Sequence, residues 1–153
     1  MKRKSTQLSK PIDSAYEDFL RGVKPVALGL VECSSRLDRE ALGRLTVRKD
    51  GGVRIISTEY NLKAADGGYF DATGRFSLAV AERAKSTPAL FIQCTYETHF
   101  HCKAPVRRDL AERFTASELR LVLWPYFREL VFDLSGKMSI PPITIPLATT
   151  GAE

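Results

Sequence analysis

Two stretches of the chain alternate strictly between apolar and polar residues, and this alternation constrains the fold more than any other feature. In residues 69–80 and 90–103 nearly every second side chain is apolar or small, which places these side chains on one face of a β-strand. Each stretch is about twice as long as a typical strand of five or six residues. The pattern predicts a wide antiparallel sheet with one face on a core and the other exposed to solvent or to another subunit.

Further extended segments precede these two strands. Residues 26–39 alternate toward a charged end, and residues 53–62 form an extended, β-branched run. Residues 45–47 also alternate, and the Asp-Gly-Gly sequence at residues 50–52 is a strong turn signal, so we expect a strand there and a hairpin across this turn. A second Asp-Gly-Gly turn at residues 66–68 separates the run at 53–62 from the strand that follows.

A short amphipathic helix is expected over residues 11–22. Pro11 suits the start of a helix, apolar residues follow at helical spacing, and Gly22 is a natural stop. The basic and polar residues 1–10 are expected to form a flexible leader.

A longer helix is expected in the last third of the chain. Thr115 and Glu118 have the spacing of a capping box, which predicts a helix that begins at about Ala116. Gly136 is placed to end this helix, and Pro125 removes a backbone donor and should bend its axis. An apolar stripe runs along it at helical spacing: Leu119, Leu123, Phe127, Leu130, Val131 and Leu134.

These elements indicate an α+β fold. The length of 153 residues suits one domain, and no linker or repeat divides residues 1–153. The chain after the long helix, residues 139–147, is extended, apolar and rich in proline. We expect this segment to dock over a core or a groove, because a free segment of this kind would expose a contiguous apolar patch.

The net charge and the hydropathy of the chain argue against some classes of protein. The net charge of +5 is a small excess for a dedicated nucleic-acid-binding protein, and no recognition motif accompanies the basic residues. No apolar run has the length of a signal-peptide core or of a membrane span of about 20 residues. We therefore expect a cytoplasmic protein that binds neither nucleic acid nor membrane.

The number and spacing of the three cysteines are consistent with a cytoplasmic protein. Cys94 and Cys102 lie on one expected strand, about 27 Å apart at about 3.4 Å per residue, so they cannot pair with each other. With Cys33 the number of cysteines is odd. We expect all three to be reduced and at least partly buried, where they act as small apolar residues.

An enzymatic interpretation depends on one pair of histidines. His99 and His101 share one face of an expected strand with Glu97, and such a pair can present two imidazoles to one metal ion. The sequence has no further histidine, so a zinc site would need a ligand from elsewhere. It also contains no nucleophile-elbow or phosphate-loop motif. We expect no catalysis and no cofactor, and a small metal-dependent enzyme is the alternative.

Residues 123–129, Leu-Trp-Pro-Tyr-Phe-Arg-Glu, and the proline-rich segment after them resemble the C-terminal signature of the SecB family of chaperones. In that family a helix carries an aromatic-Pro-Tyr-x-Arg-Glu core, and an extended segment containing proline follows it. Residues 89–96 look like the last long strand of the family. The signature residues of this chain are Trp124, Pro125, Tyr126, Arg128, Glu129 and Pro141.

This resemblance implies both a fold and a function. SecB subunits have a four-stranded antiparallel sheet of long strands with helices packed on one side, here a long C-terminal and a short N-terminal helix. They form homotetramers that are dimers of dimers, hold unfolded clients in apolar grooves, and pass secretory clients to the SecA motor. A non-catalytic chaperone, or holdase, is implied. By position, the candidates for client contact are Leu90, Phe91, Ile92, Ile140, Ile143 and Ile145, each of which could equally be part of the core.

Several features depart from the export members of the family. Gln93 replaces an acidic residue that helps to dock SecA, the net charge is basic where theirs is acidic, and Met138 replaces a glycine. The expected N-terminal helix is similar to that of divergent SecB-like proteins, some of which serve toxin–antitoxin systems as chaperones of the antitoxin. General export and a dedicated client therefore both stay open, as does a non-catalytic adaptor for one folded partner. Tyr126 and Arg128 are expected to be structural, with the Tyr126 ring buried and its hydroxyl hydrogen-bonded.

Overall fold

The structure is a computed structural model that describes residues 14–48 and 51–148. The expected leader and the first three residues of the expected N-terminal helix lie outside the described residues. In chain order the elements are α1 (Ser14–Gly22), β1 (Val23–Leu37), α2 (Arg39–Thr46), β2 (Val53–Asp66), β3 (Tyr69–Ala81), β4 (Leu90–Cys102), α3 (Arg108–Ser117) and α4 (Leu119–Lys137).

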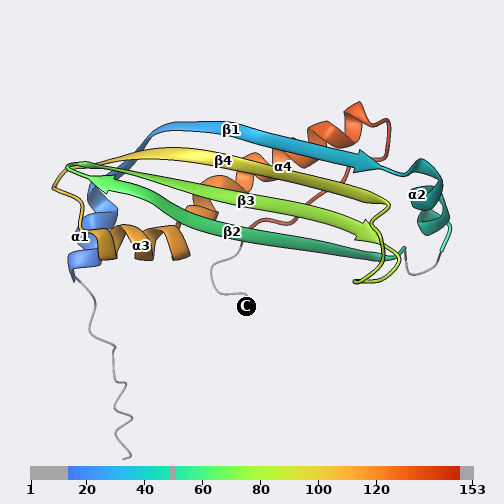
Figure 1. Cartoon of the computed structure of the whole chain (residues 1–153), viewed down its shortest axis with the longest axis horizontal. Coiled ribbons are helices and arrows are strands. Elements are labelled where there is room, and N and C mark those ends of the chain that lie inside the picture. Colours follow the sequence, from blue (N-terminus) through green and yellow to red (C-terminus); the bar gives the residue numbers. More distant parts are fainter. Residues whose placement is uncertain (1–13, 49–50, 149–153) are drawn as a thin grey trace, which may run out of the picture.

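The four strands form one antiparallel sheet in the order β1-β4-β3-β2 (Figure 1). A tight turn at residues 66–68 joins β2 to β3, and Gly67 takes a positive φ of 57° there, which glycine adopts without steric cost. β4 then pairs with β3 on one side and with β1 on the other. The expected α+β fold, with a four-stranded sheet of long strands and with the N-terminal and C-terminal helices packed on one side, is confirmed.

The hydrophobic core lies between one face of the sheet and the helices. In β3 and β4 the burial alternates residue by residue, as the sequence predicts. Phe76 of β3 stacks on Phe127 of α4, with ring centroids 5.0 Å apart. Phe70 of β3 stacks on Phe100 of β4 at 4.8 Å, and Phe114 of α3 meets the Phe100 ring edge-on at 5.1 Å. Aromatic pairs of this kind join the two layers along the length of the sheet.

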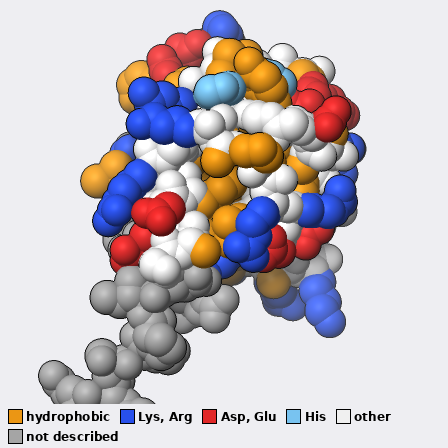
Figure 2. All heavy atoms as spheres, turned by 90° about the vertical axis from the view of Figure 1, so that its left-hand side faces the viewer, with side chains coloured by type: hydrophobic (Ala, Val, Ile, Leu, Met, Phe, Trp, Pro, Cys, Tyr) orange, Lys and Arg blue, Asp and Glu red, His pale blue; other side chains and the backbone are white. Residues whose placement is uncertain are grey.

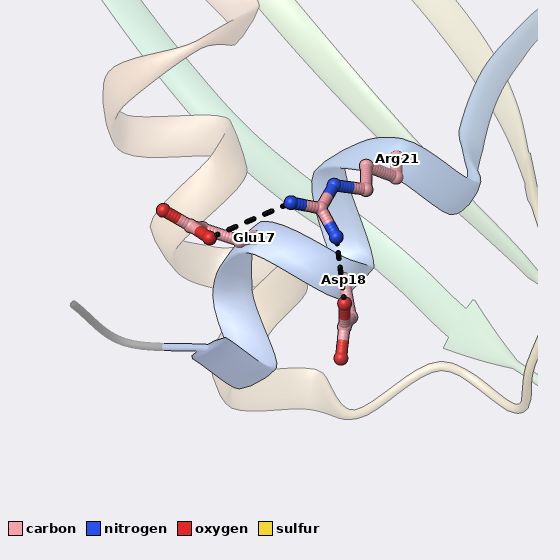
Figure 3. Close-up of polar contacts among 3 residues, drawn as sticks. All are labelled: Glu17, Asp18 and Arg21. Carbon is pink, nitrogen blue, oxygen red and sulfur yellow. Dashed lines mark hydrogen bonds and ion pairs between the residues drawn. The ribbon is translucent and has the colours of Figure 1, made fainter.

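Helix α1 closes one end of this core. Its Phe19 ring lies 5.9 Å from that of Phe70, between centroids. On the outer side of the helix, Arg21 lies 3.7 Å from Glu17 and 3.4 Å from Asp18, between side-chain nitrogen and oxygen atoms (Figure 3). These side chains are largely exposed, so the ion pairs contribute little and the buried aromatic contacts hold the helix in place.

The strand expected at residues 45–47, and the hairpin across residues 50–52, are wrong. Residues Arg39–Thr46 form helix α2, and the Gly-containing turn connects this helix to β2. The Asp38 carboxylate accepts a hydrogen bond from the Ala41 amide at 2.9 Å, which caps the start of the helix. Leu45 points into the core. A capping signal at Asp38 therefore outweighs a short apolar alternation that is equally compatible with a helix.

The expected capping box at Thr115 is also wrong. Thr115 lies near the end of α3, where its hydroxyl donates to the Ala111 carbonyl oxygen at 2.8 Å. Glu118 separates α3 from α4 and makes no side-chain capping bond. The long helix thus begins at Leu119, three residues after the predicted start, and its expected bend with Pro125 inside it is confirmed. Of the apolar stripe, four residues are buried and two are half-buried: Leu119, Leu123, Phe127 and Val131, then Leu130 and Leu134.

The cysteines are free, but they are not all buried. Cys94 and Cys102 of β4 lie in the core, whereas Cys33 of β1 is exposed. The expectation of at least partial burial is therefore wrong for Cys33. It lies on an edge strand of the sheet, and the exposure of β1 is high along most of its length because the helices make their main contacts with the other three strands.

Gly74 of β3 lies directly against Leu123 of α4. A Cβ atom added there would lie 2.4 Å from Leu123 Cδ1 and 3.2 Å from a Phe76 ring carbon. We expect Gly74→Ala to lower the free energy of unfolding by about 1–3 kcal/mol, because the buried Leu123 side chain must shift in a packed core. Urea denaturation followed by circular dichroism measures this.

Gly29 of β1 supplies the matched control. No atom lies within 4 Å of the position that a Cβ would take there. Gly29→Ala should therefore leave the free energy of unfolding within about 0.5 kcal/mol of its original value. Equal losses in the two variants would show that strand glycines matter for a reason other than contact with α4.

Candidate functional site

The segment after α4, residues 139–148, runs back along that helix, and we call it the tail. The chain reverses at Ser139, a non-glycine residue with a positive φ of 55°. The Ile140 amide donates to the Ser135 carbonyl oxygen at 3.1 Å, which closes the reversal. Arg39 of α2 donates to the Met138 carbonyl oxygen at 2.6 Å and ties α2 to the end of α4. The reversal therefore brings α2, α4 and the tail together (Figure 1).

Side chains of α4 hold the tail by its backbone. The Trp124 indole Nε1–H donates to the Pro146 carbonyl oxygen at 2.7 Å, and the Arg128 Nε–H donates to the Ile145 carbonyl oxygen at 2.6 Å. The Ser135 hydroxyl accepts from the Ile143 amide at 3.3 Å. A proline-rich segment has few amides with which to join a sheet, so its carbonyl groups take hydrogen bonds from side chains instead. This explains why a tryptophan and an arginine occur together in the signature.

Burial alternates along the tail. Ile143 and Ile145 point inward and belong to the core, while Thr144 and Pro146 point outward. The segment thus covers part of the core, in agreement with the expectation that it docks. Leu147 and the two prolines at 141 and 142 stay exposed, so the docked tail still presents apolar surface.

Two hollows lie beside the tail and share Ile143. The first, which we call the α4 hollow, has a volume of about 270 Å³ and is lined by Pro125, Arg128, Glu129, Phe132, Ile143, Thr144 and Ile145. The second, the α2 hollow, has a volume of about 150 Å³ and is lined by Leu42, Leu45, Thr46, Gly51, Arg54, Val80, Ile140, Pro141, Pro142 and Ile143. The lining is largely apolar, with two charged residues, Arg128 and Glu129, in the α4 hollow and one, Arg54, in the α2 hollow. Such surfaces can accept apolar side chains of an extended polypeptide.

Comparison with known proteins identifies the fold to which this arrangement belongs. No family model matches the chain. It is 37% identical over 43 residues to the SecB-like chaperones Rv1957 and MT2006 of two Mycobacterium tuberculosis strains, a match that covers 28% of this chain. The matched segment spans only 23% of the length of these relatives.

The solved structure of M. tuberculosis Rv1957, a SecB-like chaperone in complex with a ChAD peptide from the Rv1956 HigA1 antitoxin, aligns with a TM-score of 0.66. The alignment covers 89% of this chain and 96% of that chain, at 16% sequence identity. The fold is SecB-like. The resemblance drawn from the signature residues is confirmed by this fold and by the partial sequence match.

Within the SecB-like fold, the six residues proposed for client contact have different positions. Leu90 and Ile92 of β4 are fully buried beneath the helices, and Phe91 points to the opposite face of the sheet. Ile140 and Ile143 meet in the α2 hollow, and Ile145 lines the α4 hollow. The structure thus brings the three tail residues to the hollows, places Leu90 and Ile92 with Ile143 and Ile145 in one core, and turns Phe91 away from it. Their contact with clients stays a prediction.

The signature residues also have different positions in the structure. Trp124 and Arg128 bind the tail, and Pro125, Glu129 and Pro141 line the hollows. The Tyr126 side chain is 45% exposed, so the expectation of a buried ring is wrong. Its carbonyl oxygen accepts from the Tyr96 hydroxyl at 3.1 Å. Burial, followed by the nearby Cys94 thiol, raises the pKa of Tyr96 well above its usual value, so this hydroxyl remains a donor.

Sequence reasoning missed Leu42, Leu45 and Phe132 as residues of the site. The two leucines were assigned to no helix, although the Asp38 cap was a signal for one. Phe132 lies off the apolar stripe of α4 and is exposed. A large aromatic residue on the polar side of an amphipathic helix is itself a signal for a binding surface.

The two histidines lie near the end of the sheet where α1 and α3 pack, on the face away from the core. His99 Nδ1 is hydrogen-bonded to an Asp71 carboxylate oxygen, and its ring stacks on Tyr69 with centroids 5.2 Å apart. The His101 ring meets Tyr69 edge-on at 4.9 Å. Figure 2 shows the histidine side chains at the surface of this end. Among residues 14–48 and 51–148, no three His, Cys, Asp or Glu side chains gather closely enough to hold a metal ion.

The same described residues contain no helix that combines the length and the apolar composition needed to cross a membrane.

Proposed function

We propose that the protein is a molecular chaperone, a holdase, that binds non-native polypeptide along its docked tail. The observation that carries this proposal is the pair of largely apolar hollows lined by the tail of a SecB-like fold. An extended client would lay apolar side chains into the two hollows, and the exposed Phe132 and Leu147 would add contact area. This mode of binding needs adaptable apolar surface and no catalytic group.

We further propose that the client is a dedicated one, such as a segment of an antitoxin. The peptide in the Rv1957 structure comes from an antitoxin, which supports this choice over general export through SecA. The basic net charge and Gln93 point in the same direction, because both differ from the acidic character of export members. Affinity purification from the native cell should recover one dominant partner. Recovery of many unrelated secretory precursors would favour export instead.

Self-association is part of the proposal, with the homotetramer as the expected assembly and the cytoplasm as the expected compartment. Among the described residues, β1 has a strand partner on one side only. It is 15 residues long and exposes Val26, Leu30 and Val31. A long edge strand with exposed apolar residues is a template for pairing with a second strand, so we expect subunits to meet along β1. Multi-angle light scattering measures the mass of the assembly.

Suppression of aggregation tests the chaperone activity directly. A chemically denatured client is diluted into buffer with and without the protein, and light scattering is followed. We expect scattering to fall when the protein is added at stoichiometric amounts. Unchanged scattering, at protein concentrations that cover all its assembly states, would contradict the proposal.

Phe132→Asp is expected to weaken binding of a permanently unfolded, carboxymethylated protein by about tenfold or more, which corresponds to about 1.4 kcal/mol. Phe132 lines the α4 hollow and its ring is exposed. A carboxylate at this position would remove apolar contact with the client and would have to be desolvated on binding, while the core would be undisturbed. Isothermal titration calorimetry measures the affinity. Leu121→Asp is the control, since Leu121 is an exposed apolar residue of the same helix that lines neither hollow. Equal losses in both variants would place the client elsewhere.

A further inference from the structure

Two free thiols lie opposite each other on neighbouring strands. Cys33 of β1 and Cys94 of β4 are direct partners in the antiparallel register, so both side chains point to the same face of the sheet. Directly opposite residues in such a pair have Cα atoms about 4.5–5.5 Å apart. Disulfides form across Cα distances of about 4.4–6.8 Å. The backbone therefore already places the two cysteines within bonding range.

A register shift creates this juxtaposition. Leu30 pairs with Tyr96, and the register then shifts by one residue before Glu32 pairs with Thr95. Without that shift, continuation of the Leu30 register would place Cys33 opposite Gln93, whose side chain lies on the other face of the sheet. The irregularity in β1 thus turns Cys33 toward Cys94.

The two thiols differ in accessibility. Cys33 is exposed, whereas Cys94 is 0% exposed. Burial, followed by the proximity of Cys33, raises the pKa of Cys94 to about 12, so Cys94 by itself does not react with molecules in solution. In the free subunit, Cys33 is the thiol that an external reagent can reach, and Cys94 is the thiol that can then attack Cys33 at close range.

We propose that Cys33 and Cys94 are a redox modification site, which forms a reversible cross-strand disulfide with a low-molecular-weight disulfide such as oxidised glutathione. The Cys33 thiolate attacks one sulfur of oxidised glutathione, which forms a mixed disulfide and releases one glutathione thiolate. Cys94 loses its proton to water and attacks the Cys33 sulfur, which forms the internal disulfide and releases the second glutathione. The two protein thiols are oxidised, and one oxidised glutathione is reduced to two glutathione molecules.

The link should be easily reduced. Opposite Cβ atoms in a sheet lie about 4.5–5.5 Å apart, but a disulfide prefers about 3.5–4.5 Å, so the bond must pull β1 and β4 together. Strained disulfides are the labile and regulatory ones. The bond would fasten the edge strand β1 to the inner strand β4, at a position on the strand that we expect to meet a second subunit.

Mass spectrometry of the full-length protein tests the proposal. Cys102 shares the tryptic peptide 86–103 with Cys94, so the experiment uses the Cys102→Ala variant, in which only Cys94 can account for a link to peptide 22–36. The reduced protein is treated with oxidised glutathione, quenched with an alkylating agent, and digested. We expect the 22–36 and 86–103 peptides to be joined, with a loss of about 2 Da in the intact monomer and reversal by reduced glutathione.

Single variants separate the two steps. With Cys94→Ala added, the linked peptide should disappear, and a stable glutathione adduct should accumulate on Cys33. With Cys33→Ser added, neither the link nor the adduct should form at Cys94, because that thiol is buried. Two results would overturn the proposal. One is a Cys33 adduct that persists while Cys94 stays free to alkylation after unfolding, and the other is a disulfide between Cys33 residues of two subunits on a non-reducing gel.

Discussion

Phe127→Ala is expected to lower the free energy of unfolding by about 3–5 kcal/mol, one of the two largest effects of a single substitution that we predict for this chain. Phe127 is 0% exposed and joins the two layers of the fold. Its ring lies 5.0 Å from that of Phe76 in β3 and 5.8 Å from that of Trp124, between centroids. Truncation would remove these contacts and leave a cavity beneath Trp124, the residue that holds the tail. Urea denaturation monitored by circular dichroism gives the loss.

The same helix supplies a control of the same residue type. Phe132 is 56% exposed, so Phe132→Ala should change the free energy of unfolding by no more than about 0.5 kcal/mol. It should still weaken client binding, if the α4 hollow receives the client. A large loss of stability in Phe132→Ala, or a small one in Phe127→Ala, would mean that the helix packs on the sheet by a different face.

Ile145→Asp is expected to detach the tail while the sheet and helices stay folded. The substitution removes the burial of an isoleucine, about 1.5–3 kcal/mol, and places a carboxylate without a partner against the core. The tail has only a few hydrogen bonds to α4, so its release relieves the strain at a lower cost than global unfolding. We expect amide exchange in residues 140–148 to rise by about 100-fold or more, as measured by hydrogen–deuterium exchange mass spectrometry.

Thr144→Asp is the matched control, because Thr144 is the neighbouring residue and its side chain points to solvent. The same charge at that position should leave amide exchange in the tail nearly unchanged. Loss of the tail should also remove one wall from each hollow, so Ile145→Asp should bind unfolded clients more weakly than Thr144→Asp. Unchanged client binding with a detached tail would place the binding surface away from the hollows.

The sheet was predictable from local patterns. In β3 and β4, alternation over more than ten residues predicts both the strands and the face that is buried, because a strand has a side-chain period of two. The turn at residues 66–68 was also evident, since an Asp-Gly-Gly sequence supplies a residue that tolerates positive φ. The docking of the tail was predictable from its apolar, proline-rich composition, because a free segment of this kind would expose an apolar patch. No local rule connects Trp124 to the Pro146 carbonyl group.

The errors occur where a local signal is short. Residues 45–47 carry two apolar residues two positions apart, a pattern that fits a strand as well as a helix, and the Asp38 cap decides between them. At Thr115 and Glu118, the capping-box sequence occurs inside the end of a preceding helix, α3. A motif of two residues cannot show whether the chain before it is already helical.

The sequence by itself determined the strand periods and the apolar stripe of α4, because these depend on residue type and spacing. The side chains that bind the tail, Trp124 and Arg128, were identified only by the tertiary structure. Only the tertiary structure decided which apolar residues stay accessible. Leu90 and Cys33 both face the helix side of the sheet, yet Leu90 is buried and Cys33 is exposed. Exposure depends on what packs over a residue, and the sequence around a residue does not contain that information. For the same reason, Phe132 is exposed and Phe127 of the same helix is buried.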